Sequence, residues 1–215
     1  MSAQDVRYVY GEYAYSDVQS AQAHSYLLPA LLKALEGAGP GPILDLGCGN
    51  GSIAHRLLAL GFDVHGVDAS ASGVELARKQ GSPERFHVMD LGRDDLPAAI
   101  AGKRFATVIS TEVIEHLYDP RAMLRLAMRL LDHQPGSRLI VSTPYHGYLK
   151  NLAIALCGKM DKHLTVLWDG GHIKFFSRRT LEQMLQEEGF RPVGFQGAGR
   201  WPYLWKSMVI TAEVA

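Results

Sequence analysis

The chain has 215 residues, of which 47% are hydrophobic, and its 22 basic and 22 acidic side chains give a formal net charge of zero. A chain of this length can bury a substantial core in one globular unit, so we expect a single domain over residues 1–215. Its lysines and arginines form no run, which argues against a nucleic-acid partner and favours a small-molecule one.

The two cysteines and the polar start of the chain predict a cytoplasmic protein. Cys48 and Cys157 form neither a short-spaced metal pair nor a disulfide framework, and the first residues, MSAQDVRYVYGEYAYSD, lack the apolar core of a secretory signal. The longest strongly apolar stretch, residues 152–157, is far shorter than the roughly 20 residues that cross a bilayer. We therefore expect no transmembrane segment.

The first half of the chain shows an alternating pattern after a tyrosine-rich start. Four tyrosines, at positions 8, 10, 13 and 15, precede a predicted helix over residues 18–35. From Gly41 onward, short β-branched or aliphatic runs alternate with helical patterns, which is typical of βαβ units and a parallel sheet. The predicted strands are residues 42–47, 63–68, 86–89, 105–111 and 137–143, and the predicted helices are residues 52–60, 72–80 and 120–131.

The C-terminal part departs from this alternation. Ser177 begins a capped helix that ends at Gly189, and two extended runs, residues 192–196 and 207–214, follow it. Because only a loop joins these two runs, we expect them to be antiparallel to each other. The predicted architecture is a doubly wound α/β fold, whose mostly parallel seven-stranded sheet has an antiparallel C-terminal edge.

A glycine loop follows the first predicted strand. In ILDLGCGNGS, the glycines at positions 47, 49 and 51 allow a tight turn and a close approach of the backbone to a ligand. The spacing is GxGxG, because position 52 is serine, whereas a dinucleotide-binding loop has GxGxxG. This difference argues against one alternative, an NAD-dependent oxidoreductase.

Three aspartates stand at the ends of three consecutive predicted strands, beside this loop. Asp45 can pair with the ammonium group of a bound amino acid, and Asp68 can accept hydrogen bonds from both hydroxyls of a ribose. Asp90 ends the third strand. The set fits an adenosine joined to an amino acid, whereas the alternative is that all three aspartates only cap the helices that follow.

The motifs DLGCGNG, VDAS, MDL and TEVIEHL resemble the successive motifs of class I S-adenosylmethionine (SAM)-dependent methyltransferases. The resemblance implies a Rossmann-like methyltransferase fold with SAM as methyl donor. The resemblance assigns residues to each part of the donor. Those at the methionine end are Asp45, Gly47, Cys48 and Gly49, and Asp68 binds the ribose. Those at the adenine are Ala69, Met89, Asp90 and Leu91, and Thr111 forms the floor of the donor site. We expect the Cys48 side chain to be a small packing residue, since no basic partner that would activate a thiol is near it in sequence.

The segment TEVIEHLYDP, after the fourth predicted strand, carries three ionisable groups. Methyl transfer from a sulfonium is an in-line displacement, in which the protein aligns the reactants and removes a proton from a hydroxyl acceptor. Glu112 and His116 are four residues apart and Glu115 adjoins them, so on a helical turn all three can point toward one cavity. The alternative is that Glu115 and His116 are surface residues. The cluster also argues against a SAM-binding protein without chemistry.

A second resemblance covers this segment and the residues that follow the fifth strand. TEVIEHLYDP and STPYHGYLKNLAIALCGKMDKHLTVLWDGGHIKFFS resemble the ubiquinone-pathway O-methyltransferases, which share Glu-x-x-Glu-His, a Thr-Pro and an insertion that ends in a histidine. The resemblance implies methyl transfer to the oxygen of a small molecule, with catalytic roles for Glu112, Glu115, His116 and His172. In some members the Glu-x-x-Glu-His group binds a divalent metal. This insertion reads WDGGHIKFF, so a quinone precursor is not assumed as substrate.

Residues 145–176 form a connection that is too long for an ordinary α/β fold and are therefore expected to be functional. Apolar side chains recur there at helical spacing, at Leu149, Leu152, Ala153 and Leu156. Such a helix can cover a hydrophobic acceptor, rest on an anionic membrane surface as a peripheral contact, or pack on the domain. We predict a lid that encloses the acceptor together with the N-terminal lid and helix, residues 1–40, and whose His172 faces the pocket.

Overall fold

The computed structural model describes residues 22–92, 96–164, 167–168 and 170–215. Its elements, in chain order, are α1 (Gln22–Leu35), β1 (Ile43–Leu46), α2 (Ser52–Ala59), β2 (Val64–Asp68), α3 (Ala71–Lys79), η1 (Pro83–Arg85), β3 (Phe86–Val88), β4 (Thr107–Thr111), η2 (Ile114–His116), α4 (Pro120–Leu130), β5 (Arg138–Pro144), α5 (Tyr148–Leu156), α6 (Met160–Leu164), α7 (Arg178–Glu187), β6 (Phe190–Ala198) and β7 (Ser207–Val214). The elements η1 and η2 are short 3-10 helices. The tyrosine-rich start of the chain lies outside the described residues.

The strands form one seven-stranded sheet in the order β3-β2-β1-β4-β5-β7-β6. The first five strands are parallel, and β7 is antiparallel to both β5 and β6. The predicted fold class, with its antiparallel C-terminal edge, is thereby confirmed. The strand order reverses between β1 and β4, and open α/β sheets bind their ligands beyond the carboxyl ends of the strands at such a point.

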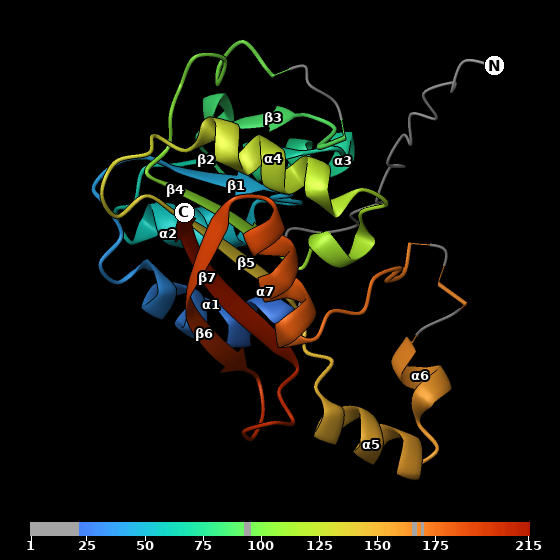
Figure 1. The fold of residues 1–215 in the computed structure, drawn as a ribbon. Helices are drawn as coiled ribbons and strands as arrows, with labels where there is room; N and C mark the ends of the chain where they lie inside the picture. Colours follow the sequence, from blue (N-terminus) through green and yellow to red (C-terminus); the bar gives the residue numbers. More distant parts are fainter. Residues whose placement is uncertain (1–21, 93–95, 165–166, 169) are drawn as a thin grey trace, which may run out of the picture.

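Helices cover both faces of the sheet (Figure 1). The face under α4 and α7 is packed with side chains such as Met123, Leu124 and Leu181. The opposite face, under α1, α2 and α3, is packed with side chains such as Leu27, Ile53 and Val74. Strands that are buried on both faces read as continuous apolar runs, which explains why the sequence showed β1 and β4 so clearly.

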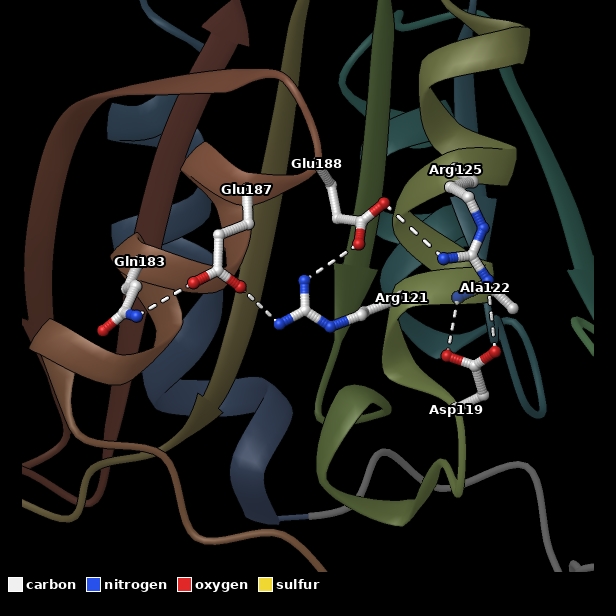
Figure 2. Close-up of polar contacts among 7 residues, drawn as sticks. All are labelled: Asp119, Arg121, Ala122, Arg125, Gln183, Glu187 and Glu188. Carbon is white, nitrogen blue, oxygen red and sulfur yellow. Dashed lines mark hydrogen bonds and ion pairs between the residues drawn. The ribbon is translucent and has the colours of Figure 1, made fainter.

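An ion-pair network joins α4 to the end of α7 at the surface (Figure 2). Arg121 donates to Glu187 and, at 2.9 Å, to one oxygen of Glu188, whose other oxygen lies 3.6 Å from Arg125. Arg125 also donates to Asp119, at 3.1 Å, which caps the start of α4. Because exposed ion pairs contribute about 0.2–1 kcal/mol each, we expect the apolar core beneath this network to stabilise α7 more than the network does.

The helices α5 and α6 lie apart from the sheet and its covering helices (Figure 1). On α5, Tyr148 is 79% exposed and Leu156 is 80% exposed, and on α6 no residue is buried. The interpretation that the apolar helix merely packs on the domain is therefore wrong, and α6 was not predicted at all. None of the helices in the described part of the chain has the length and apolar character needed to cross a bilayer.

Candidate active site

The strand β1 leads directly into the glycine loop. The φ angles of its three glycines are all positive, at 81° for Gly47, 52° for Gly49 and 75° for Gly51. A Cβ atom at Gly47 would lie 2.4 Å from Val113, and one at Gly51 would lie 2.8 Å from Ala77. The backbone conformation and the lack of space both require glycine here, so the predicted tight turn at the carboxyl end of β1 is present.

The carboxylate of Asp68, at the end of β2, is held against this loop. Its Oδ2 accepts a hydrogen bond from the N–H of Gly49 at 2.7 Å, and its Oδ1 accepts one from the N–H of Ser70 at 2.7 Å. Charge-assisted bonds of this kind fix the direction of a carboxylate. Asp68 therefore lies beside the glycine loop, where the ribose of the donor is expected.

The interpretation that the three aspartates cap helices is wrong. The helix α2 begins after Gly51 with no side-chain cap, and the cap of α3 is Ser70, whose hydroxyl accepts from a backbone N–H at 3.1 Å. Asp90 accepts from the N–H of Gly92 at 2.8 Å, within a turn. None of the described helices is capped by Asp45, Asp68 or Asp90, so capping does not explain their positions.

Asp45 is fully buried in β1, and neither of its oxygens has a hydrogen-bond partner among the described residues. Burial, followed by the nearby charge of Asp68, raises the pKa of this carboxyl to about 8. A buried carboxylate is costly unless a cation compensates it. SAM carries both an ammonium group and a sulfonium, so the chemistry of this position fits that donor.

The other residues assigned to the donor lie at the carboxyl ends of β2, β3 and β4. Met89 and Leu91 are buried in the core cluster under α4, and Ala69 and Thr111 are half-buried. Cys48 is buried, and burial raises the pKa of its thiol well above the ordinary value. A thiol of this kind is inert, which favours the expected packing role. The donor contacts of these residues stay predictions.

Glu115, His116 and His172 come together beyond β4. One ligand atom from each of the three side chains lies within 4.8 Å of the other two. The Nε2 atom of His172 is 4.0 Å from Oε1 of Glu115. The ring centroids of His116 and His172 are 4.8 Å apart. The backbone N–H groups of Ile173 and Lys174 donate to the carbonyl of Glu115, at 2.9 and 3.0 Å, and so attach the end of the insertion to η2.

Burial sets the protonation of this cluster. It raises the pKa of Glu115 well above the ordinary value, and the charge of Glu112 adds to the effect. Oε2 of Glu115 accepts from the hydroxyl of Thr143 at 2.9 Å, whereas Oε1 has no partner among the described residues. Burial also lowers the pKa of His116, and lowers that of His172 to about 4. Both imidazoles are therefore neutral at neutral pH.

Glu112 does not share this arrangement, although the sequence predicted that it would point toward the same cavity. The expected helical turn is absent, because Glu112 has a φ of 55° and only Ile114–His116 form a 3-10 turn. Its carboxylate instead accepts from the hydroxyls of Ser142, at 2.9 Å, and Ser207, at 3.0 Å. Burial raises the pKa of Glu112 to about 7. The i,i+4 argument failed because it holds only for regular helices.

Several side chains in the hydrogen bonds around Glu112 and Glu115 carried little signal in the sequence. Thr143 belongs to the Thr-Pro pair that ends β5, which pointed to a strand end but not to Glu115 as its partner. Tyr26 and Ser207 are hydrogen bonded at 3.2 Å although 181 residues separate them. No local pattern relates two such positions, so only the fold brings them together.

Comparison with known proteins gives the family. A family model described as a methyltransferase domain matches residues 19–194. The chain belongs to the methyltransferase-domain family. Relatives named ubiquinone biosynthesis O-methyltransferase are 31% identical over 165 residues in Cereibacter sphaeroides (76% of this chain, 65% of that one) and 33% identical over 158 residues in Dinoroseobacter shibae (72% and 62%). This methyltransferase domain thus spans somewhat less than two thirds of the length of these two relatives.

Solved structures of other methyltransferases share the fold of this domain. Magnesium protoporphyrin IX methyltransferase from Synechocystis PCC 6803, with bound SAH, superposes with a TM-score of 0.61 and 21% identity over 88% of this chain and 80% of that one. The 1,6-didemethyltoxoflavin-N1-methyltransferase from Burkholderia thailandensis, with bound S-adenosylhomocysteine, superposes with a TM-score of 0.63 and 20% identity. This match covers 90% of this chain and 79% of that one. The Rossmann-like methyltransferase fold is thereby confirmed, and the alternative of an NAD-dependent oxidoreductase is wrong.

Proposed function

We propose that this methyltransferase transfers the methyl group of SAM to an oxygen atom of a small, hydrophobic acceptor. The observation that carries the proposal is the convergence of Glu115, His116 and His172 beyond β4, at the carboxyl edge of the sheet where Asp45 and Asp68 would hold the donor. When bound, SAM supplies an electrophilic methyl group, which passes to the acceptor oxygen as the carbon–sulfur bond breaks.

His116 is the proposed base for the acceptor hydroxyl. Burial holds its pKa below the usual value, so the imidazole is neutral and can accept a proton at neutral pH. The carboxyl of Glu115, with an oxygen that has no partner among the described residues, lies within 4.8 Å. The positive charge that forms on the imidazole would favour the ionised form of this carboxyl, which would then stabilise the imidazolium. His172, at the end of the insertion, would close the acceptor side of the site.

In a metal-dependent alternative, the same three side chains would hold a divalent metal ion, and His116 would then be a ligand instead of the base. Two neutral imidazoles and a carboxylate oxygen without a described partner are a suitable donor set for such an ion. A cation there would favour the ionised form of Glu115 and so offset the effect of burial. A bound metal would lower the pKa of an acceptor hydroxyl. Glu112, which Ser142 and Ser207 hold, is expected to remain outside this ligand set.

The acceptor is proposed to be hydrophobic because the insertion presents apolar side chains. Leu149, Leu152 and Leu156 on α5 are 53%, 41% and 80% exposed, and an acceptor or a membrane surface would cover them. The names of the relatives, ubiquinone biosynthesis O-methyltransferase, support oxygen as the methylated atom. We propose that residues 145–176 act as a lid over this acceptor; the tyrosine-rich start of the chain, which the sequence predicts to take part in the lid, lies outside the described residues.

The test measures methyl transfer and donor binding separately. Radiolabelled SAM is incubated with a catechol acceptor, with and without a divalent metal, and SAM affinity is measured by calorimetry. Glu115→Gln and His116→Ala should each lower turnover by about a hundredfold or more, because general acid–base groups contribute on that scale. SAM affinity should change little. Glu75→Gln, at an exposed position of α3, is the matched control and should retain full turnover.

The outcome separates the remaining alternatives. Full activity of the Glu115→Gln, His116→Ala double variant would remove the cluster from the mechanism. SAM binding without methyl transfer to any catechol or to a metabolite extract would instead favour a SAM-binding protein that has no chemistry. If a metal takes part, a chelator should reproduce the loss seen in both variants.

A further inference from the structure

A second group of basic side chains gathers in the insertion, apart from the three residues of the proposed metal site. His146 follows β5, Lys150 lies in the first turn of α5, and His163 lies on α6. The ring centroids of His146 and His163 are 5.4 Å apart, and His146 also contacts the ring of Phe175, at 5.1 Å. Three separate segments thus bring three basic groups to one place.

These groups have more donors than the protein satisfies. Lys150 is only 6% exposed, and the structure shows one hydrogen bond from its ammonium group, to the carbonyl of Lys206 at 3.2 Å. An ammonium group carries three donors. Nε2 of His163 is buried and has no partner in the described part of the chain, and α5 begins beside Lys150 without a side-chain cap. Buried polar atoms without partners indicate that a ligand supplies the partners: acceptors for the unused donors of Lys150, and a donor or an acceptor for Nε2 of His163, according to its tautomer.

The charges in this cluster point to the sign of that ligand. Burial lowers the pKa of Lys150 to about 8, and the charge of Arg200 contributes, whereas Glu112 acts in the opposite direction. Burial also lowers the pKa of His146 to about 4, and the charges of Lys150 and His163 add to the effect. At neutral pH Lys150 therefore carries the positive charge of the cluster beside two neutral imidazoles, and an anion next to its ammonium group would favour that charged form.

We propose that Lys150, His146 and His163 form a subsite for a carboxylate group of the methyl acceptor. This inference rests on the proposed function, since it takes the insertion as one wall of the acceptor site. Lys150 interacts electrostatically with His146, His163 and Glu112, so a carboxylate bound there lies on the acceptor side of the site rather than beside Asp45. The acceptor class is then a hydroxylated carboxylic acid.

The test compares two acceptors that differ only in charge. Calorimetry measures the binding of 3,4-dihydroxybenzoate and of 3,4-dihydroxytoluene to protein saturated with S-adenosylhomocysteine, so that the carboxylate of the donor is already in place. The acid should bind at least about tenfold more tightly, which is the scale of a charge-assisted hydrogen bond. Lys150→Met should abolish the preference and Lys150→Arg should retain most of it. Lys79→Met, at an exposed lysine of α3, is the control and should leave the preference intact.

His163→Gln gives a second variant that does not depend on the buried lysine, and it should reduce the preference at least threefold. Equal binding of the two probes, binding of neither, or a preference that survives Lys150→Met would overturn the subsite. A loss of S-adenosylhomocysteine affinity in Lys150→Met equal to the loss for the acid would overturn it too, because the lysine would then hold the donor. Preferential binding of the acid without methyl transfer would contradict the proposed function but would still support the subsite.

Discussion

At the scale of single residues, the burial of Asp45 opposes folding of the ligand-free protein. Its carboxyl has a pKa of about 8 in the folded state against an ordinary value of 3.8. Below pH 3.8 the carboxyl is protonated in the folded and in the unfolded state, so it does not make the free energy of unfolding depend on pH. Between pH 3.8 and about 8 the unfolded chain ionises while the folded protein stays protonated, so folding becomes less favourable as the pH rises.

Asp45→Asn should remove this pH dependence. The Tm of the variant minus that of the unchanged protein, measured by scanning calorimetry without ligand, should increase by several degrees between pH 5 and pH 8.5. SAM should bind the variant more weakly, because the variant lacks the carboxylate that would pair with the positive charge of SAM. A Tm difference that stays constant over this range would show that the folded carboxyl is already ionised at pH 5.

Asp68→Ala should weaken SAM binding at least about tenfold, since charge-assisted hydrogen bonds to the ribose contribute about 1.5–3 kcal/mol each. The glycine loop loses the acceptor of the Gly49 N–H as well, so circular dichroism and Tm serve as checks that the domain still folds. Asp63→Ala, at an exposed aspartate just before β2, is the matched control. Unchanged SAM affinity by calorimetry would show that Asp68 has only a structural role.

The positions in the fold of the residues assigned to the donor were easier to predict than the positions of those assigned to the acceptor. Asp45 lies near the carboxyl end of β1, the three glycines follow β1, and Asp68 ends β2, so sequence order alone places them at one edge of the parallel sheet. Glu112 did not follow the expected direction, because its positive φ turns it toward Ser142 and Ser207. Its environment depends on contacts made 30 and 95 residues away in the sequence, which no local spacing encodes.

At the scale of elements, hydrophobic periodicity predicted the strands and the covering helices well. The bounds of β2 and β7 agree with the sequence to within one residue. The bounds and 3-10 form of η2 were not predicted, and neither was the helix α6. Segments of three and five residues carry too few positions for a period to be visible.

The lid hypothesis predicts a change in backbone protection over residues 145–176. Hydrogen exchange should be fast for α5 and α6 in the free protein, because these helices lie apart from the core, and it should slow when S-adenosylhomocysteine and acceptor are bound together. The buried strand β4 serves as an internal reference. Strong protection without ligand, combined with normal activity after deletion of residues 151–164, would contradict the lid.

At the scale of the whole molecule, exposed apolar side chains gather at one end. Leu156 on α5 is 80% exposed, and Trp201 and Tyr203, between β6 and β7, are 79% and 60% exposed. The two segments are neighbours, since Lys150 donates to the carbonyl of Lys206 and interacts electrostatically with Arg200. A patch of this kind, with basic groups around it, is suited to an anionic membrane surface.

This arrangement predicts peripheral binding to anionic vesicles. The protein should sediment with phosphatidylglycerol vesicles at low ionic strength and be released by about 0.5 M salt, which screens the attraction of its lysines and arginines to the lipid head groups. Leu156→Asp and Trp201→Asp should each weaken binding several-fold, because each places a charge against the bilayer. Leu60→Asp, at a leucine that is 58% exposed beyond the end of α2, should have no effect. Failure of the unchanged protein to sediment, or an equal loss in the Leu60→Asp control, would show that the apolar end faces the acceptor alone, and the lid would then account for its exposure.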